Sequence, residues 1–150
     1  MGTTTAPAQF AHPAVEVEWL GGPRFEARRP GGPGIQIDAD AATAPSPVDV
    51  LLASLASCAA TDVVTILGKQ RTPARTLKVR IEAQRMQGTP RRLAAASLHF
   101  SIDAPGTTAA KVRRAVELSV TKYCSVRASL STDIPITWTI DLTELAAHRR

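Results

Sequence analysis

Aromatic residues are scarce in this sequence, and that scarcity argues against one class of partner. Phe, Trp and Tyr make up 4% of the 150 residues, which leaves few rings to stack on nucleic-acid bases. The net charge of +5 comes from 18 Lys and Arg residues scattered along the chain rather than gathered in one segment. A solvated basic surface explains this charge, so we predict no nucleic-acid partner.

Long hydrophobic runs are also missing. The longest uncharged apolar stretch runs from Val50 to Thr61 between Asp49 and Asp62, and a membrane helix needs about 20 apolar residues. The first 15 residues contain no Lys or Arg, so we expect neither a secretory signal nor a transit peptide. We therefore expect no membrane partner and a cytoplasmic location. In that compartment, paired cysteines are more often catalytic or redox-sensing than structural.

The motifs that would bind a metal or a nucleotide are absent as well. The histidines at positions 12, 99 and 148 form neither HxH nor HExxH, and the two cysteines form no CxxC. The glycine-rich PGGPG stretch at 30–34 matches neither GxGxxG nor GxxxxGK. We predict no metal and no cofactor.

Alternation of apolar and polar residues predicts six short strands. In residues 14–20, Val15, Val17 and Trp19 alternate with glutamates, which is typical of a strand with one buried face. Turns rich in Gly and Pro separate the first three strands and indicate a meander. We expect a flexible N-terminal tail over residues 1–13 and one domain over 14–150. The predicted strands cover 14–20, 24–28, 34–38, 76–84, 95–103 and 136–141.

Two helices interrupt these strands. The first begins at Ser46-Pro47-Val48-Asp49, where Ser46 can cap and Asp49 faces the positive end of the helix dipole, and we expect Gly68 to end it. Apolar residues occur on every face of this helix, which predicts burial on all sides. The second helix begins near Thr107 and is amphipathic, and a short turn of helix follows it. The order β-β-β-α-β-β-α-β indicates an α+β fold. A single sheet can cover one face of the first helix, so either a second sheet or a second subunit must cover the rest, and this burial suggests a homodimer.

The two cysteines can be interpreted in several ways. Cys58 lies in the middle of the first helix and Cys124 follows the second, 66 positions later. A cysteine taken alone is more often a buried core residue than a nucleophile. A pair could reduce a peroxide, because one thiolate forms a sulfenic acid and the other thiol condenses with it. Spacing in the sequence does not show whether the two sulfurs meet.

The segments SPVDVLLASLASCAATDVV (46–64) and KYCSV (122–126) resemble the OsmC/Ohr family of small thiol proteins, and its OsmC-like branch more closely than Ohr. With the order of elements, the resemblance extends from about Val15 to Asp141. It implies an intertwined homodimer with two sites at the subunit interface. It also implies reduction of organic hydroperoxides, with Cys58 as the peroxidatic and Cys124 as the resolving cysteine. The reductant would be a dithiol, either a lipoyl group or a small thiol.

The resemblance also implies an activating ion pair. Desolvation raises the pKa of a mid-helix thiol, so a cation must be brought to Cys58. Family members use an arginine from the N-terminal strands, held by an acidic residue at the start of the long helix. Asp49, nine residues before Cys58, occupies that acidic position with a side chain one methylene shorter than glutamate. Arg24 is the first candidate for the arginine and Arg28 the second. Without the family, Asp49 would be a first-turn acid and Arg24 a solvated strand residue.

Three function classes follow from these residues. The first is a thiol peroxidase acting in oxidative stress defence. The second is a non-enzymatic protein that binds a small ligand or senses redox state on the same fold. The third is a structural dimer in which the cysteines only pack.

Overall fold

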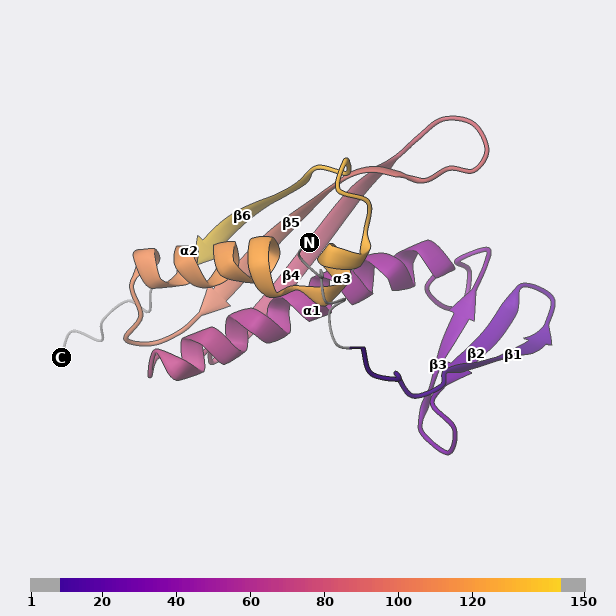
Figure 1. Cartoon of the computed structure of the whole chain (residues 1–150), viewed down its shortest axis with the longest axis horizontal. Coiled ribbons are helices and arrows are strands. Elements are labelled where there is room, and N and C mark those ends of the chain that lie inside the picture. The colour runs from indigo at the N-terminus through magenta and orange to yellow at the C-terminus, as the bar shows by residue number, and fades with distance from the viewer. Residues whose placement is uncertain (1–8, 144–150) are drawn as a thin grey trace, which may run out of the picture. The chain divides into compact units, whose positions relative to one another are not determined.

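The computed structural model describes residues 9–143, which fall into two compact units divided between Val50 and Leu51 (Figure 1). Each unit has its own three-stranded sheet. The mixture of two small sheets with helices confirms the predicted α+β class. Most of the expected tail at 1–13, and His148, lie outside the described residues. The boundaries expected for that tail and for a domain over 14–150 remain predictions.

The first unit is the predicted meander. Its strands are β1 (Glu16–Gly21), β2 (Arg24–Arg28) and β3 (Gly34–Asp38), antiparallel in the order β1-β2-β3. Gly21 ends β1 and Gly22 begins the first turn, and both have a positive φ that other residues adopt at a cost. The register places the apolar side chains opposite one another across the three strands, on one face of the sheet. They are Val17, Trp19, Phe25, Ala27, Ile35 and Ile37.

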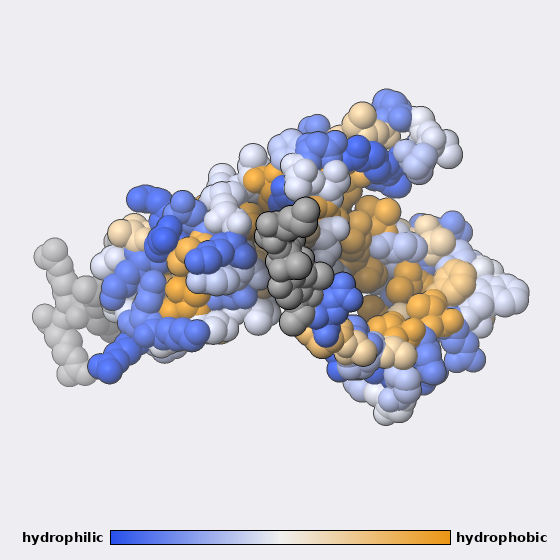
Figure 2. Space-filling view, in the orientation of Figure 1, coloured by the Kyte–Doolittle hydropathy of each residue, from blue (hydrophilic) through white to orange (hydrophobic). Residues whose placement is uncertain are grey.

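This apolar face stays largely open in the single chain. Val17 is 63% exposed and Trp19 is 66% exposed. The alternation over 14–20 therefore predicted the strand correctly, but not the burial of one of its faces. Hydrophobic side chains that remain in contact with water over several neighbouring strands indicate a surface that another surface covers (Figure 2).

The long helix α1 (Pro47–Lys69) begins where the sequence predicts it. We expected Gly68 to end the helix, but the helix includes Gly68 and ends at Lys69. Arg71 instead adopts the left-handed conformation, with φ of 60°. The backbone amides of Arg71 and Thr72 then donate to the carbonyls of Gly68 and Leu67, each at 3.0 Å, and satisfy the helix end.

The second unit packs helices against the other sheet. Strands β4 (Thr76–Arg85) and β5 (Leu93–Asp103) form the predicted antiparallel hairpin, and β6 (Ile136–Leu142) lies parallel to β5. The crossover between β5 and β6 holds α2 (Ala109–Leu118), the π-helical turn η1 (Ser119–Tyr123) and α3 (Ser125–Ser129) (Figure 1). The core forms between α1, α2 and the middle strand β5, around Phe100.

Only one side of α1 is buried in the single chain. Its buried residues share one face, at a spacing of about four: Leu55, Ala56, Ala59, Val63 and Leu67. Val64 on another face is 47% exposed. A three-stranded sheet and α2 cover one face only, so burial of the other faces of α1 stays a prediction.

The expectation that the chain does not span a membrane stays a prediction. By length and composition alone, α1 is long and apolar enough to cross a bilayer, because its single mid-helix charge at Asp62 does not lower its mean hydropathy enough to exclude this. A core helix of a globular fold can meet the same two criteria. In this chain α1 packs its buried face into the core of the second unit.

Candidate thiol site

The structure brings the two cysteines together. Cys58 lies half-buried in the third turn of α1 and packs against the core, and Cys124 follows η1 with 3% of its surface exposed. Cys58 packs against the core cluster that includes Cys124, the two thiols interact electrostatically, and neither sulfur is in a disulfide. Two residues 66 positions apart in the sequence thus form one dithiol pair in the fold.

A π-helical turn positions Cys124. Helix α2 begins at Thr108, whose hydroxyl accepts a hydrogen bond from the Lys111 amide at 3.3 Å. At the other end of α2 the backbone widens into η1, and the Cys124 amide donates to the Ser119 carbonyl at 2.9 Å. Such turns are rare and often occur at functional sites. The chain then leaves the helix at Cys124, whose sulfur accepts a hydrogen bond from the Arg127 amide at 3.4 Å.

The electrostatics of the pair are asymmetric. Burial raises the pKa of the Cys124 thiol, and the hydrogen bond from the Arg127 amide opposes that rise. The neighbouring Cys58 raises the pKa of Cys124 further, because a negative charge on one sulfur disfavours a second on the other. On balance the surroundings of Cys124 favour its neutral thiol.

Asp49 forms a capping box with Ser46. One carboxylate oxygen, Oδ2, accepts from the Ser46 amide at 2.8 Å and from its hydroxyl at 2.7 Å. The Asp49 amide donates back to the Ser46 hydroxyl at 3.2 Å. The Ser46 side chain and then its amide hold the pKa of Asp49 below its usual range, so this carboxylate is ionised at neutral pH. The other oxygen, Oδ1, takes no part in these three bonds.

The two candidate arginines have different surroundings in the first unit. Arg24 opens β2 on the polar face of the sheet, is exposed, and has no ion-pair partner within residues 9–50. Arg28 is half-buried and pairs with Glu18 at 3.2 Å and with Glu26 at 2.9 Å. Arg24 therefore has the guanidinium that can take a new partner without breaking an existing pair. Its role toward the thiols stays a prediction, because it belongs to the other unit.

Two residues near the thiols were not singled out from the sequence. Ser119 is fully buried at the start of η1, and its hydroxyl donates to the Ala59 carbonyl at 2.8 Å. Asp62, one turn after Cys58 on α1, has a buried carboxylate oxygen, Oδ2, without a hydrogen-bond partner. The sequence contains a feature that could have drawn attention to each residue. Ser119 is a polar residue at an apolar-face spacing of α2, and Asp62 is the single charged residue between Asp49 and Lys69.

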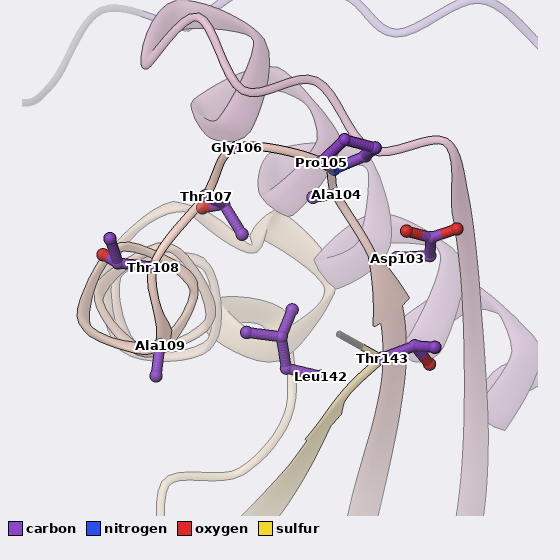
Figure 3. A pocket seen from close by; sticks show the side chains of 9 residues that line it. All are labelled: Asp103, Ala104, Pro105, Gly106, Thr107, Thr108, Ala109, Leu142 and Thr143. Carbon is purple, nitrogen blue, oxygen red and sulfur yellow. The ribbon is translucent and has the colours of Figure 1, made fainter. Parts of the chain in front are cut away.

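Cavities in the second unit lie in two different surroundings. One of about 330 Å³ opens between the end of β5 and the start of α2, and its lining includes Asp103, Thr107 and Leu142 but no thiol (Figure 3). Asp103 is held there by Arg75 at 2.6 Å. Another cavity, of about 510 Å³, lies between α1 and the end of α2, with Asp62 and Tyr123 in its lining. One residue that lines this larger cavity, Tyr123, directly precedes Cys124 in the sequence.

With this geometry in view, comparison with known proteins decides the family. The model of the family described as OsmC-like protein matches residues 39–139, which include both cysteines and Asp49. The chain belongs to the OsmC-like protein family. Protein YhfA of Escherichia coli K12 is 35% identical over 124 residues, which cover 82% of this chain and 92% of YhfA.

Solved structures of other proteins share the fold of this chain. A hypothetical protein from Aquifex aeolicus is 26% identical with a TM-score of 0.76, over 90% of this chain and all of that one. An organic hydroperoxide resistance protein OsmC from Legionella pneumophila is 12% identical with a TM-score of 0.65, over 89% and 99% of the two chains. The second likeness concerns the fold alone. The resemblance inferred from residues 46–64 and 122–126 is thus confirmed.

Proposed function

We propose that this protein is a thiol peroxidase that reduces organic hydroperoxides, with Cys58 as the peroxidatic and Cys124 as the resolving cysteine. The observation that supports it is the contact between the two thiols, in which the surroundings keep the proton on Cys124. Cys58 is a partly exposed residue, and Cys124 is buried. Attack on a peroxide from outside therefore falls to Cys58.

The first half-reaction uses one thiolate. Cys58 loses its proton, and its sulfur attacks the terminal oxygen of the hydroperoxide. The sulfur–oxygen bond forms as the oxygen–oxygen bond breaks, and the alkoxide that leaves takes up a proton to become an alcohol. Cys58 is oxidised by two electrons to a sulfenic acid, and the hydroperoxide is reduced by two.

The second half-reaction uses the neighbouring thiol. Cys124 gives up its proton, and its sulfur attacks the Cys58 sulfur. The sulfur–sulfur bond forms as hydroxide leaves, and hydroxide with that proton makes water. A dithiol, either a lipoyl group or a small thiol, then reduces the disulfide and is itself oxidised to a disulfide. A cytoplasmic setting would supply such a reductant.

The names of relatives support this proposal at the level of the family. The Legionella protein is named for organic hydroperoxide resistance, and Protein YhfA bears a name without an activity. The proposal for this chain therefore depends on its own pair of thiols. The same fold without an activated Cys58 would be the non-enzymatic ligand-binding or redox-sensing protein that the sequence also allowed.

An arginine completes the proposed site. Arg24, with Arg28 as the second candidate, would supply the cation that favours the Cys58 thiolate, and Asp49 would hold the guanidinium through its second oxygen. An ionised Asp49 with Oδ1 outside the capping bonds supports this role. So does an Arg24 without an ion pair in its own unit.

A homodimer is part of the same proposal. In the single chain, the apolar face of the first sheet and one face of α1 are exposed. On α1, the hydroxyls of Thr61 and Thr65 donate to the carbonyls four residues earlier, at 2.8 and 2.9 Å, so burial of these two side chains would leave no hydroxyl donor of theirs unsatisfied. A second copy of the chain would bury both surfaces and bring an arginine of one subunit to the thiols of the other.

Stoichiometric peroxide consumption tests the roles of the two cysteines. After exposure to tert-butyl hydroperoxide, mass spectrometry of the wild type should show an intramolecular disulfide between Cys58 and Cys124. Cys58→Ser should abolish turnover and leave Cys124 reduced. Cys124→Ser should consume about one equivalent and stop as a sulfenic or more oxidised acid.

A structural disulfide would behave differently. Either substitution would then lower the melting temperature, and neither would change peroxide consumption selectively. A Cys58→Ser protein that consumes peroxide at the wild-type rate would end the case for Cys58 as the nucleophile.

A further inference from the structure

Asp62 and Ser119 are connected to the dithiol pair through both elements that carry it. Asp62 lies four residues after Cys58, on the next turn of α1 and on the same side. Ser119 begins η1, the turn that ends at Cys124. The Ser119 hydroxyl donates to the carbonyl of Ala59, the residue after Cys58, at 2.8 Å. One fully buried hydroxyl thus joins the helix of one cysteine to the turn of the other.

The hydrogen bonds at this hydroxyl determine which form of Asp62 fits. A hydroxyl has a single hydrogen, and the Ser119 hydrogen is used on the Ala59 carbonyl. The Asp62 carboxyl interacts with the same hydroxyl, and this interaction lowers the pKa of Asp62. An ionised carboxylate would compete with Ala59 for that hydrogen, whereas a protonated Asp62 would donate to the Ser119 oxygen and leave the bond to Ala59 intact.

The surroundings of Asp62 favour the protonated form. Burial raises the pKa of Asp62, and its contact with Ser119 opposes this rise. The other oxygen, Oδ2, is buried without a donor among the described residues. An ionised carboxylate needs several donors when buried, so an unpartnered oxygen fits a neutral acid better.

The backbone of Ser119 transmits this arrangement to Cys124. The Ser119 carbonyl accepts the amide of Cys124 at 2.9 Å, the bond that closes the π-helical turn. Side chain and carbonyl of one residue therefore hold α1 and Cys124 at the same time. A shift of Ser119 away from Ala59 would move the Cys124 sulfur away from Cys58.

We infer that Asp62 and Ser119 are positioning residues for disulfide formation, because the relay from Asp62 through Ser119 to Ala59 holds the Cys124 sulfur against Cys58. The inference rests on the proposed function in that disulfide formation is the resolving step of the peroxidase. The inference concerns only the position of the Cys124 sulfur. Attack of Cys58 on peroxide does not depend on where Cys124 lies.

Rapid-quench mass spectrometry separates the two steps. Ser119→Ala and Asp62→Ala should leave the rate of Cys58 sulfenic acid formation within about threefold of the wild type. Both should slow formation of the disulfide about tenfold or more, since a sulfur displaced by about 1 Å loses much of its reactivity. Asp62→Asn should restore the wild-type rate, because its amide can donate to the Ser119 oxygen as the protonated acid does.

Thr121→Ala is the matched control. The Thr121 hydroxyl lies in the same turn, is exposed, and donates only to the Glu117 carbonyl four residues earlier. Its removal should change neither step. Disulfide formation at the wild-type rate in both Ser119→Ala and Asp62→Ala would overturn the inference. So would equal slowing of both steps, which would indicate general damage to the fold.

Diamide oxidation distinguishes a failure of this inference from a failure of the peroxidase proposal. Diamide oxidises two neighbouring thiols to a disulfide and is itself reduced to a hydrazine, without any peroxide. The wild type could fail to reduce hydroperoxides and still form the Cys58–Cys124 disulfide with diamide about tenfold faster than Ser119→Ala. That result would support the positioning role and contradict the peroxidase proposal. Equal diamide rates in the two proteins would overturn the positioning role.

Discussion

At the scale of single residues, this molecule gives similar groups different surroundings. Cys58 reaches solvent in part, whereas burial and the Cys58 contact raise the pKa of Cys124. Among carboxyls, Asp49 is kept ionised by Ser46, and Asp62 is pushed toward its neutral form by burial. The proposed chemistry depends on these differences, since one thiol must lose its proton first and one acid must keep its proton.

The activating arginine can be identified by alkylation of Cys58. Arg24→Ala should slow the reaction of Cys58 with iodoacetamide at pH 7 about tenfold, because each unit of thiol pKa changes the thiolate fraction about tenfold. The measurement uses a Cys124→Ser background, so that one sulfur reacts. Arg29→Ala, at an exposed residue just after β2, is the control and should change nothing.

Arg28→Ala separates the two candidates. A rate that is normal in Arg24→Ala and falls in Arg28→Ala would assign the role to Arg28. Normal rates in both would contradict an activated thiolate that depends on either arginine.

The pKa of Asp62 predicts how stability depends on pH. Its native pKa is raised above the usual 3.8, so above that pH the native state holds a proton that the unfolded chain has lost. The stability contributed by this group is complete below pH 3.8 and is lost as pH rises through the native pKa. The gain in stability from Asp62→Asn should therefore grow as pH rises from 4 through the native pKa of Asp62, as measured by urea unfolding.

Asp133 provides a control of the opposite sign. A hydrogen bond from Arg92, and then one from Ser131, lowers the pKa of Asp133 to about 2. The stability that this group contributes is complete above pH 3.8 and is lost only below it. The effect of Asp133→Asn should thus be constant between pH 5 and pH 8. An effect of Asp62→Asn that does not grow as pH rises from 4 would contradict the raised pKa of Asp62.

At the scale of elements, α1 has two roles on different faces. Leu55, Val63 and Leu67 bury one face in the core of the second unit, and Thr61, Val64 and Thr65 remain exposed on others. The apolar residues of one side pack in the core of the chain, whereas those of the exposed side would pack against a second chain. Substitutions on the two sides should therefore fail in different ways.

Leu55→Asp should unfold the protein. Leu55 is 1% exposed, and an unpaired charge buried there costs about 3–5 kcal/mol, a large share of the about 5–15 kcal/mol that stabilises a domain. Circular dichroism should show lost helix or a melting temperature lower by at least about 10 °C. Met86→Asp, at a residue that is 50% exposed after β4, is the control and should melt near the wild type. A Leu55→Asp protein as stable as this control would contradict the core position of that face.

At the scale of the whole molecule, the exposed apolar surfaces predict an obligate homodimer. Sedimentation should give a mass of about 32 kDa at micromolar concentration, twice the 15.9 kDa of the chain. Trp19→Arg and Val64→Arg should each dissociate the dimer or prevent folding, because a charge would enter the interface. Met86→Arg should remain dimeric. A stably folded wild-type monomer at micromolar concentration would contradict the dimer.

The local elements could be predicted from the sequence because their signals are local. Alternation in β4 and the capping residues Ser46 and Asp49 act within a few positions, so all six strands and the start of α1 agree with prediction. The predicted end of α1 was wrong because a second residue nearby could also end the helix. Gly68 could end a helix, but Arg71 takes the left-handed conformation instead.

What the sequence alone determined is therefore the order of elements, the α+β class and the presence of two cysteines in a family pattern. Only the tertiary structure decided that the Cys58 and Cys124 side chains touch, and that a buried Ser119 hydroxyl joins α1 to the π-helical turn. The physical reason is the range of the interactions. Periodicity and capping arise between near neighbours in the chain, whereas the thiol pair and its hydrogen-bonded relay join residues about 60 positions apart, which meet only when α1 and α2 pack on the same sheet.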